Sequence, residues 1–167
     1  MLITMRPRPD RSRGFTLIEV LGALVVVAVL VSIAMPAYTS HVRKARRADA
    51  LAAIAAVQQA QERHRANHLL YATHFIVADG QWTGLGASTD ANAATALVAA
   101  GGHYRLTIDG ADTAGYRIVA TARGDQARDV GCAVLRASVQ GAQWRHESGP
   151  TAALGNDAPA NRRCWSR

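Results

Sequence analysis

The sequence predicts an α+β fold, in which a long N-terminal α-helix packs on a four-stranded antiparallel β-sheet. An apolar run of 21 residues, 15–35, lies near the N-terminus, and apolar residues continue beyond it at helical spacing. Four segments in the second half of the chain instead alternate apolar and polar residues with a period of two. One helical stretch followed by a series of strands is typical of α+β proteins.

The length and composition leave room for one modest globular domain beside a membrane segment. The chain has 167 residues and a formal net charge of +7. This excess of positive charge attracts acidic partners, nucleic acid among them. The basic residues are not interleaved with aromatic ones as in single-strand binders, so we expect an ordinary solvated basic surface. DNA binding is compatible with the sequence but unsupported by it.

The apolar run can cross a membrane as a helix. Residues 15–35 would extend over about 31 Å, enough for the hydrocarbon core, and 13 of them are Leu, Ile, Val or Phe. These side chains favour insertion by about 6 kcal/mol, which outweighs the cost of Glu19 near the end of the run. The run is longer than the apolar part of a secretory signal, and no small-x-small cleavage site follows it. We therefore expect a single membrane-spanning segment.

Pro36 follows the apolar run and predicts a kink, because a proline inside a helix removes one backbone hydrogen bond and clashes with the preceding turn. Basic residues flank the run equally on both sides, so the positive-inside rule does not settle its orientation. Beyond the proline, an amphipathic half-helix is expected to pack its apolar face on the sheet. Its apolar positions are Val42, Ala45, Leu51, Ile54, Ala55 and Val57.

The second half of the chain contains the strand signals. Alternating segments separated by turn residues predict strands at 103–108, 116–122, 132–139 and 142–147. Between the long helix and these strands, the alanine-rich stretch 88–102 predicts a short helix. Thr89 or Asp90 would cap its start and Gly101 would close it.

The two cysteines, Cys132 and Cys164, lack the CxxC spacing of zinc and redox motifs. With a membrane-targeted N-terminus, one disulfide in an oxidising compartment is the simplest interpretation, and it favours an extracytoplasmic C-terminus. Two unpaired buried thiols are the alternative. A bond would close a loop of 33 residues and stabilise the fold by roughly 3–4 kcal/mol.

No pattern of residues indicates an enzyme, a cofactor or a metal ion. His64 and His68 stand one turn apart with His74 nearby, but no carboxylate or cysteine lies at zinc-ligand spacing, so solvated histidines are expected. The arginines that flank the acids of the loop 124–129 argue against a calcium site. Nucleophile, phosphate-loop and dinucleotide motifs are absent from the sequence. These observations predict a structural protein.

The stretch RGFTLIEVLG, residues 13–22, resembles the processing and methylation signature of type IV pilins and the related pseudopilins. A basic leader ends in Gly14, and an aromatic residue and an acid follow at fixed spacing inside an apolar run. Pro36 and Tyr38 also fit the family, and the C-terminal half resembles it by layout. The chain looks most like the PilE-type minor pilins. The resemblance also implies melting of the helix between Gly22 and Pro36 in the assembled fibre.

The resemblance implies a role for each residue of the motif. Prepilin peptidase would cut after Gly14, and the new N-terminal residue, Phe15, would be N-methylated. Glu19 would pair with the free amine of a neighbouring subunit's Phe15, since a carboxylate among apolar helices is compensated by an ammonium group. The three parts of the chain would be the cleaved leader 1–14, the membrane and assembly half of the helix 15–42, and the globular head 43–167 with its C-terminal disulfide loop.

The implied function is that of a type IV pilus subunit. It would be held in the bacterial inner membrane by one span with a periplasmic head, and then polymerised with other pilin subunits by the pilus assembly machinery. The surface filament would serve adhesion, motility or DNA uptake. A type II secretion pseudopilin is the first alternative, which bound calcium would favour and a disulfide would disfavour. A membrane-anchored periplasmic enzyme or ligand-binding domain is the second, which an unprocessed N-terminus would support.

Overall fold

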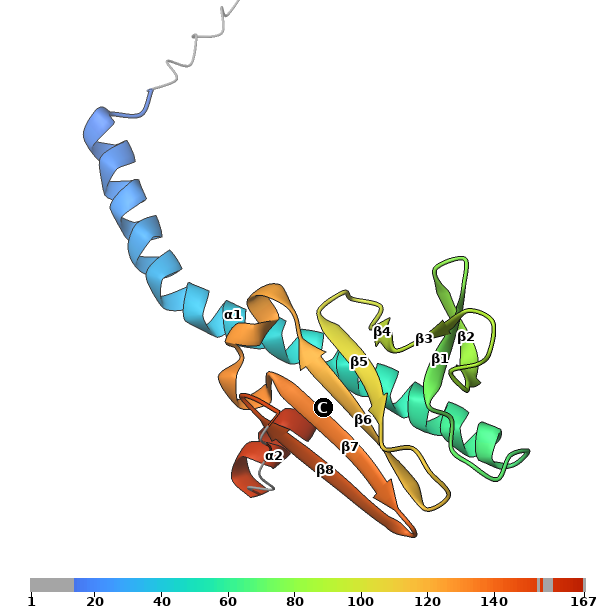
Figure 1. The fold of residues 1–167 in the computed structure, drawn as a ribbon. Coiled ribbons are helices and arrows are strands. Elements are labelled where there is room, and N and C mark those ends of the chain that lie inside the picture. Colours follow the sequence, from blue (N-terminus) through green and yellow to red (C-terminus); the bar gives the residue numbers. More distant parts are fainter. Residues whose placement is uncertain (1–13, 153, 155–157, 167) are drawn as a thin grey trace, which may run out of the picture. The chain divides into compact units, whose positions relative to one another are not determined.

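The computed structural model describes residues 14–152, 154 and 158–166, so the predicted leader lies outside the described residues apart from Gly14. The chain divides into two compact units, Met1–Ser40 and His41–Arg167. Helix α1 (Leu17–Arg65) contributes to both units, and all the strands belong to the second, which we call the head (Figure 1).

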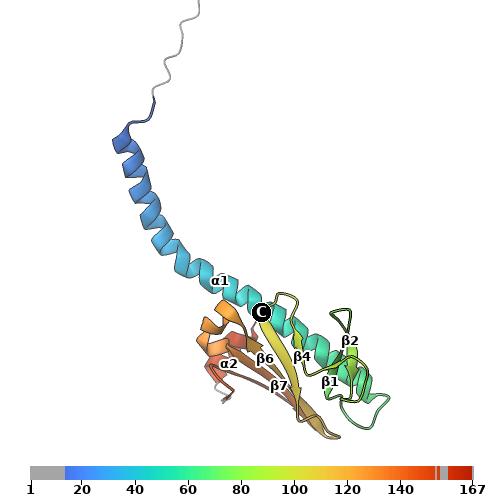
Figure 2. The ribbon, with the colours of Figure 1, turned by 45° about the horizontal axis from the view of Figure 1, so that its top comes forward.

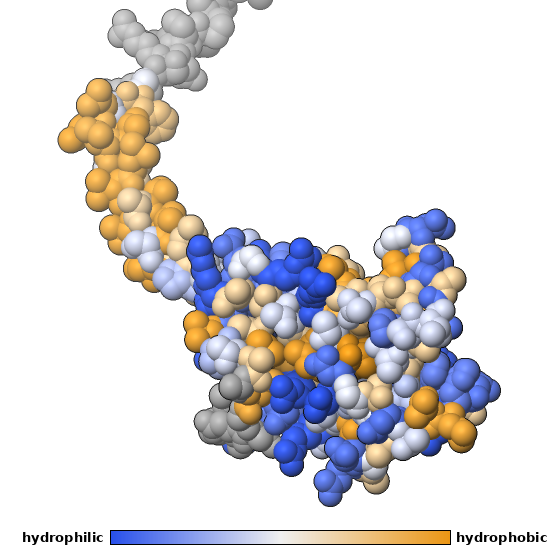
Figure 3. All heavy atoms as spheres, in the orientation of Figure 1, coloured by the Kyte–Doolittle hydropathy of each residue, from blue (hydrophilic) through white to orange (hydrophobic). Residues whose placement is uncertain are grey.

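The first unit is an exposed apolar helix. The described side chains from Phe15 to Tyr38 are exposed, and the large apolar ones among them cover this part of α1 (Figure 3). The helix is long and apolar enough to cross a membrane. The hydroxyls of Ser32, Thr39 and Ser40 each donate to the backbone carbonyl three residues earlier over 2.7–2.9 Å, which satisfies these polar groups within the helix.

Pro36 lies inside α1, and the helix continues through it and through Gly22 in this single subunit. The kink at Pro36 and the melting between Gly22 and Pro36 in a fibre stay predictions.

The head contains a five-stranded antiparallel sheet with the order β4-β5-β6-β7-β8. Its last four strands lie at the four predicted positions and follow one another as a meander, as expected. One edge strand, β4, was not predicted. The bounds are β4 (Ala96–Val98), β5 (Tyr104–Asp109), β6 (Gly115–Ala122), β7 (Val134–Gln140) and β8 (Gln143–Gly149).

A second, three-stranded sheet with the order β2-β1-β3 follows α1. Its bounds are β1 (His74–Ala78), β2 (Gln81–Gly86) and β3 (Ala93–Ala94). The remaining elements are two 3₁₀ turns, η1 (Gly124–Arg128) and η2 (Val130–Cys132), and a C-terminal helix, α2 (Ala158–Trp165).

The short helix predicted at 88–102 is wrong, because this segment forms the edge strands β3 and β4 instead. The Asp90 carboxylate accepts the Ala87 backbone N–H over 2.7 Å and stabilises a turn rather than a helix start. Beyond it, β3 pairs with β1, and β4 pairs with β5. Pairing with strands already in place outweighs the helix propensity of the alanines.

The core of the head lies between α1 and one face of the five-stranded sheet, as Figures 1 and 2 show. From α1, Ile54 and Val57 are buried as predicted, whereas Ala45 and Ala55 are exposed. From the sheet, alternate residues of neighbouring strands meet the helix. The largest fully buried ones are Tyr104, Leu106, Tyr116, Ile118 and Leu135.

Candidate functional site

The N-terminal motif starts α1 with a reciprocal pair of hydrogen bonds between Thr16 and Glu19. The Glu19 backbone N–H donates to the Thr16 hydroxyl over 3.3 Å, and the Thr16 backbone N–H donates to the Glu19 carboxylate over 3.5 Å. In this capping box, two side chains satisfy backbone donors that a helix start leaves open. Glu19 therefore has a local role within a single subunit, besides the assembly role that the sequence predicts.

Gly14 and Phe15 lie before α1 and are exposed. A Cβ atom placed on Gly14 would meet no atom within 4 Å, so no contact among the described residues requires glycine at this position. The Phe15 side chain is 83% exposed. Cleavage and methylation at this junction stay predictions.

The disulfide that the two cysteines suggested is present. The Sγ atoms of Cys132 and Cys164 are 2.01 Å apart, and the bond joins η2 to α2. Both residues are fully buried. The Trp165 indole N–H also donates to the Glu147 carbonyl over 3.3 Å. Helix α2 is therefore attached both to η2 and to the edge strand β8.

A buried polar network connects α1 with the turns before the disulfide. The Arg47 guanidinium donates to the Asp129 carboxylate over 2.6 Å. The Gln126 amide donates to the same carboxylate over 3.2 Å and to the Tyr104 hydroxyl over 3.1 Å. Burial raises the pKa of Tyr104, so its hydroxyl stays protonated and donates to the Cys132 carbonyl over 3.1 Å.

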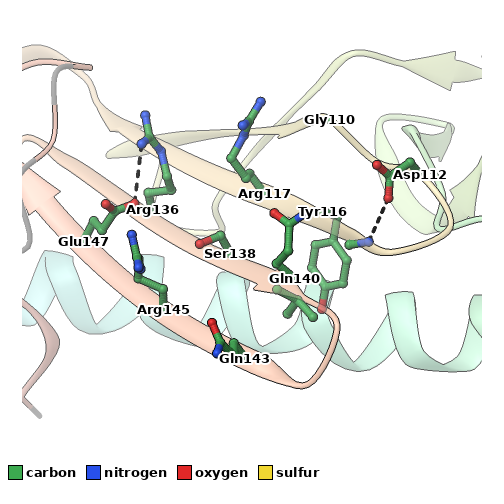
Figure 4. Close-up of a pocket in the computed structure, with 12 residues that line it drawn as sticks. Gly110, Asp112, Tyr116, Arg117, Arg136, Ser138, Gln140, Gln143, Arg145 and Glu147 are labelled. Atoms are coloured by element: carbon green, nitrogen blue, oxygen red, sulfur yellow. Dashed lines mark hydrogen bonds and ion pairs between the residues drawn. The ribbon is translucent and has the colours of Figure 1, made fainter.

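Arginines cover the face of the sheet that points away from α1. On β6 and β7 the buried residues alternate with outward ones, as the two-residue period of a strand requires. On β8 the first four residues are all exposed, and its pairing with β7 assigns its residues to the two faces. Arg117 of β6 lies opposite Ser138 of β7, which lies opposite Arg145 of β8. In the next row, Arg136 lies opposite Glu147. Three arginines from three adjacent strands thus share one surface (Figure 4).

This surface is hollowed. It forms an open depression of about 580 Å³ whose lining includes the three arginines and the two glutamines at the β7–β8 turn. We call the surface formed by Arg117, Arg136, Gln140, Gln143 and Arg145 the arginine face.

Two of the acids beside the arginine face have partners, whereas Asp109 lies opposite Arg117 and forms no ion pair among the described residues. Glu147 pairs with Arg136 over 3.4 Å. Asp112 accepts the backbone N–H groups of Ala114 and Gly115, and these bonds lower the pKa of its carboxyl group. Among the described residues, Arg117 and Arg145 form no ion pair. Two cations of the face are therefore available to an anionic ligand.

The residues weighed as metal ligands are not assembled into a site. The rings of His64 and His68 stack at 4.1 Å between centroids, with no acid completing a ligand set. In the loop 124–129, Asp125 and Asp129 each pair with an arginine. Within the part of the chain that the structure describes, no group of three or more His, Cys, Asp or Glu residues could hold a metal ion.

The arginine face was not among the predictions from the sequence, although its signal is present there. The period of two predicts the buried residues and, equally, the outward positions between them. Those positions hold Arg117, Arg136 and Arg145. Their alignment across strands also depends on the register, which the sequence alone does not provide.

Two family models match the chain. The model described as "Type IV minor pilin ComP, DNA uptake sequence receptor" matches residues 36–136, which is more than half of the chain. The model described as "Prokaryotic N-terminal methylation motif" matches residues 9–35. The two matches are adjacent and together cover the helix and most of the strands.

One similar curated protein is the "Prepilin peptidase-dependent protein D" of Escherichia coli (strain K12). It is 47% identical over 36 residues, which are 22% of this chain and 25% of that protein. The chain thus matches about a quarter of the length of that relative. No solved structure matches the chain.

Proposed function

Because the chain belongs to the ComP family of type IV minor pilins, we propose that its head binds DNA at the arginine face. As a minor pilin, the chain is anchored in a membrane before it is assembled into a pilus. Pilin subunits and prepilin peptidase are the partners that membership in this family implies.

The match over residues 36–136 carries the proposal, because the family is described as a receptor for DNA uptake sequences. The arginine face supplies the chemistry. Guanidinium groups bind phosphate oxygens through two parallel hydrogen bonds, and Arg117 and Arg145 have no ion pair among the described residues that would compete with DNA. Phosphate contacts of this kind dominate the affinity of proteins for DNA.

Two glutamines on the same surface can contribute to the choice of sequence. Gln140 and Gln143 are paired across the β7–β8 turn, and both are exposed. A two-stranded β-ribbon fits the major groove, and a glutamine amide can bond an adenine there through two hydrogen bonds. We therefore assign the phosphate contacts to the arginines and base contacts to the glutamines of this turn.

The test is DNA binding by the full-length protein in detergent, measured by fluorescence anisotropy with a labelled duplex over a range of salt concentrations. The double variant Arg117→Gln/Arg145→Gln should bind about tenfold more weakly or worse. The slope of the logarithm of its binding constant against the logarithm of the salt concentration should become shallower by about two. The reason is that each lost phosphate contact releases about one counterion fewer.

The matched control is Arg63→Gln/Arg128→Gln, which removes the same charge from exposed positions away from the arginine face. The control should keep a binding constant close to that of the wild type. Equal losses of affinity in both variants would mean that DNA binding depends only on the net charge of the protein, and the proposed binding surface would be wrong.

We further propose that the N-terminal motif acts as it does in pilins. Prepilin peptidase cuts between Gly14 and Phe15, and Phe15 is then methylated. In the filament, Glu19 pairs with the amine of a neighbouring Phe15, and Pro36 kinks the helix. The proposed parts of the chain are the leader 1–14, the membrane and assembly half 15–42, and a globular part 43–167, which begins two residues after the start of the head as defined above.

The proposed role is structural and DNA-binding rather than enzymatic, and it requires no cofactor. A pseudopilin of type II secretion is the weaker alternative, because the chain belongs to a pilin family and has the disulfide that favours a pilin. Adhesion and motility depend on the filament as a whole. DNA uptake is the activity that the description of the family supports.

A further inference from the structure

The residues that directly follow the membrane-spanning part of α1 are basic. Arg43, Lys44 and Arg46 lie on the first turns of α1 that belong to the head. Lys44 is exposed, and the two arginines are half-exposed. These cations have no part in the DNA site proposed above.

A second basic segment lies against the first. The Gln126 amide of η1 donates to the Arg43 carbonyl over 3.4 Å, which places η1 beside α1. Arg46 and Arg123 line one hollow of about 400 Å³, together with His103 and Asp125. Figure 3 shows strongly hydrophilic residues over the part of the head where η1 lies in Figure 1. We call Arg43, Lys44, Arg46 and Arg123 the basic patch.

The basic patch is not neutralised within the head. Among the described residues, none of its four cations forms an ion pair. Asp125 pairs with Arg128 over 3.7 Å, and Asp129 forms an ion pair with the buried Arg47. The patch therefore presents an excess of positive charge that attracts a counter-charge on another molecule.

The position of these residues in the chain favours a lipid as the source of that charge. Arg43 follows Met35, the last residue of the apolar run, by only eight positions in the chain. Arginine and lysine side chains this close in the chain to a membrane segment can extend to the polar layer of the bilayer. The positive-inside rule gives no reason for cations on the head side of the span.

We propose that the basic patch binds the anionic headgroups of phospholipids in the membrane that holds the subunit before assembly. The lipid phosphate supplies the missing negative charge, and several contacts together hold the head against the membrane surface. Juxtamembrane lysines and arginines each strengthen binding to an anionic surface by about fivefold. Extraction of the subunit into a filament breaks these contacts, so the patch slows departure from the membrane.

The test uses the full-length protein in nanodiscs that contain phosphatidylcholine and a minority of phosphatidylglycerol. Native mass spectrometry of the released protein counts the lipids that remain bound. The wild type should retain phosphatidylglycerol at several times its share of the bilayer. The variant Arg46→Gln/Arg123→Gln should lose most of this enrichment. The control Arg63→Gln/Arg65→Gln, which removes the same charge from the last turn of α1, should keep it.

A second measurement needs no variant. Hydrogen exchange of the η1 segment, 124–128, in the wild type should be several-fold slower in discs with phosphatidylglycerol than in discs of phosphatidylcholine alone. High salt should abolish the difference, because it screens contacts between exposed charges.

Three outcomes would overturn the proposal. The first is retention of the two lipids in their bulk ratio, and the second is equal exchange in both kinds of disc. The third is a patch variant that keeps its lipid enrichment while losing DNA binding or incorporation into filaments, since the patch would then serve DNA or a neighbouring subunit. None of these results depends on the arginine face, so the two proposals fail separately.

Discussion

The guanidinium of Arg47 on α1 and the carboxylate of Asp129, which lie 82 positions apart in the chain, form a buried ion pair at 2.6 Å. Both residues are only 8% exposed. The carboxylate also accepts the Gln126 amide, so this pair joins the long helix to the turns that lead into the disulfide. Two charges removed from water in this way depend on each other.

We predict that Arg47→Ala destabilises the head by about 3–5 kcal/mol, because it leaves the Asp129 carboxylate buried without a counter-charge. The measurement is thermal unfolding of the full-length protein in detergent. The matched control is Arg128→Ala, which breaks an ion pair whose two side chains are about three-quarters exposed and should cost no more than about 1 kcal/mol. Equal losses of unfolding free energy in the two variants would mean that the buried ion pair stabilises the head no more than the exposed pair does.

The four strands of the meander could be predicted from the sequence, because local patterns determine them, whereas β4, the three-stranded sheet and helix α2 were not predicted. Strands β5 to β8 follow from the period of two and from turn residues, both of which act over short distances in the chain. The prediction of a helix at 88–102 was wrong, because pairing with other strands determines the structure of this stretch. Its strands form by pairing, β3 with β1 and β4 with β5, and composition alone, which favoured a helix, does not reveal these partners.

The candidate site was predictable only where its residues are close together in the sequence. Gly14, Phe15 and Glu19 belong to one short motif, which can be found by the spacing of its residues. The partnership of Arg47 with Asp129 depends on the rotation of α1 against the sheet, which no local pattern encodes.

We predict that the requirement for glycine at position 14 comes from the peptidase and not from the fold. A Cβ atom on Gly14 meets nothing within 4 Å, so Gly14→Leu should fold normally and remain as full-length precursor in cells. Intact-mass spectrometry distinguishes the precursor from the product. Gly22→Leu is the control, because Gly22 is equally open and lies beyond the cut. A processed Gly14→Leu protein would contradict cleavage at this junction.

We predict that replacing the Glu19 carboxylate with an amide separates its two roles, which are capping the helix and pairing with a neighbouring subunit's amine. Glu19→Gln keeps a side chain that can complete the capping box with Thr16 but removes the charge that would attract a neighbour's amine. It should be processed normally, and its share in sheared filaments should fall at least tenfold. Thr16→Val, which removes the capping hydroxyl and keeps the charge, should have a smaller effect. If Glu19 only caps the helix, Glu19→Gln should enter filaments as well as the wild type.

We predict that the disulfide stabilises the head by roughly 3–4 kcal/mol, since it closes a long loop in the unfolded chain. The double variant Cys132→Ala/Cys164→Ala should therefore unfold at a lower temperature, and α2 should detach from η2 before the sheet melts. Hydrogen exchange of α2 and of β7 in the full-length protein measures the two steps. Unchanged protection of α2 would show that the contact of Trp165 with β8 is sufficient to hold it.

The stacked pair His64 and His68 near the end of α1 predicts a pH dependence. Burial, and next the charge of His68, lower the pKa of His64, while a backbone hydrogen bond at Leu70 and the charge of Asp90 partly oppose this shift. The unfolded chain then binds a proton at His64 more readily than the folded head does. The contribution of neutral His64 to the stability of the head should therefore be fully present above a pH of about 6.5, which is the ordinary pKa of histidine. This contribution should decrease as the pH falls below that value.

Thermal unfolding of the full-length protein between pH 7.5 and 5.5 measures this effect, in a range where carboxyl groups with ordinary pKa values stay ionised. His68→Gln removes the like charge but leaves His64 half-buried, so it should reduce the loss of stability on acidification without abolishing it. His64→Gln removes the group with the lowered pKa and should reduce the loss further. A loss of the same size in both variants and in the wild type would place the pH dependence elsewhere in the head.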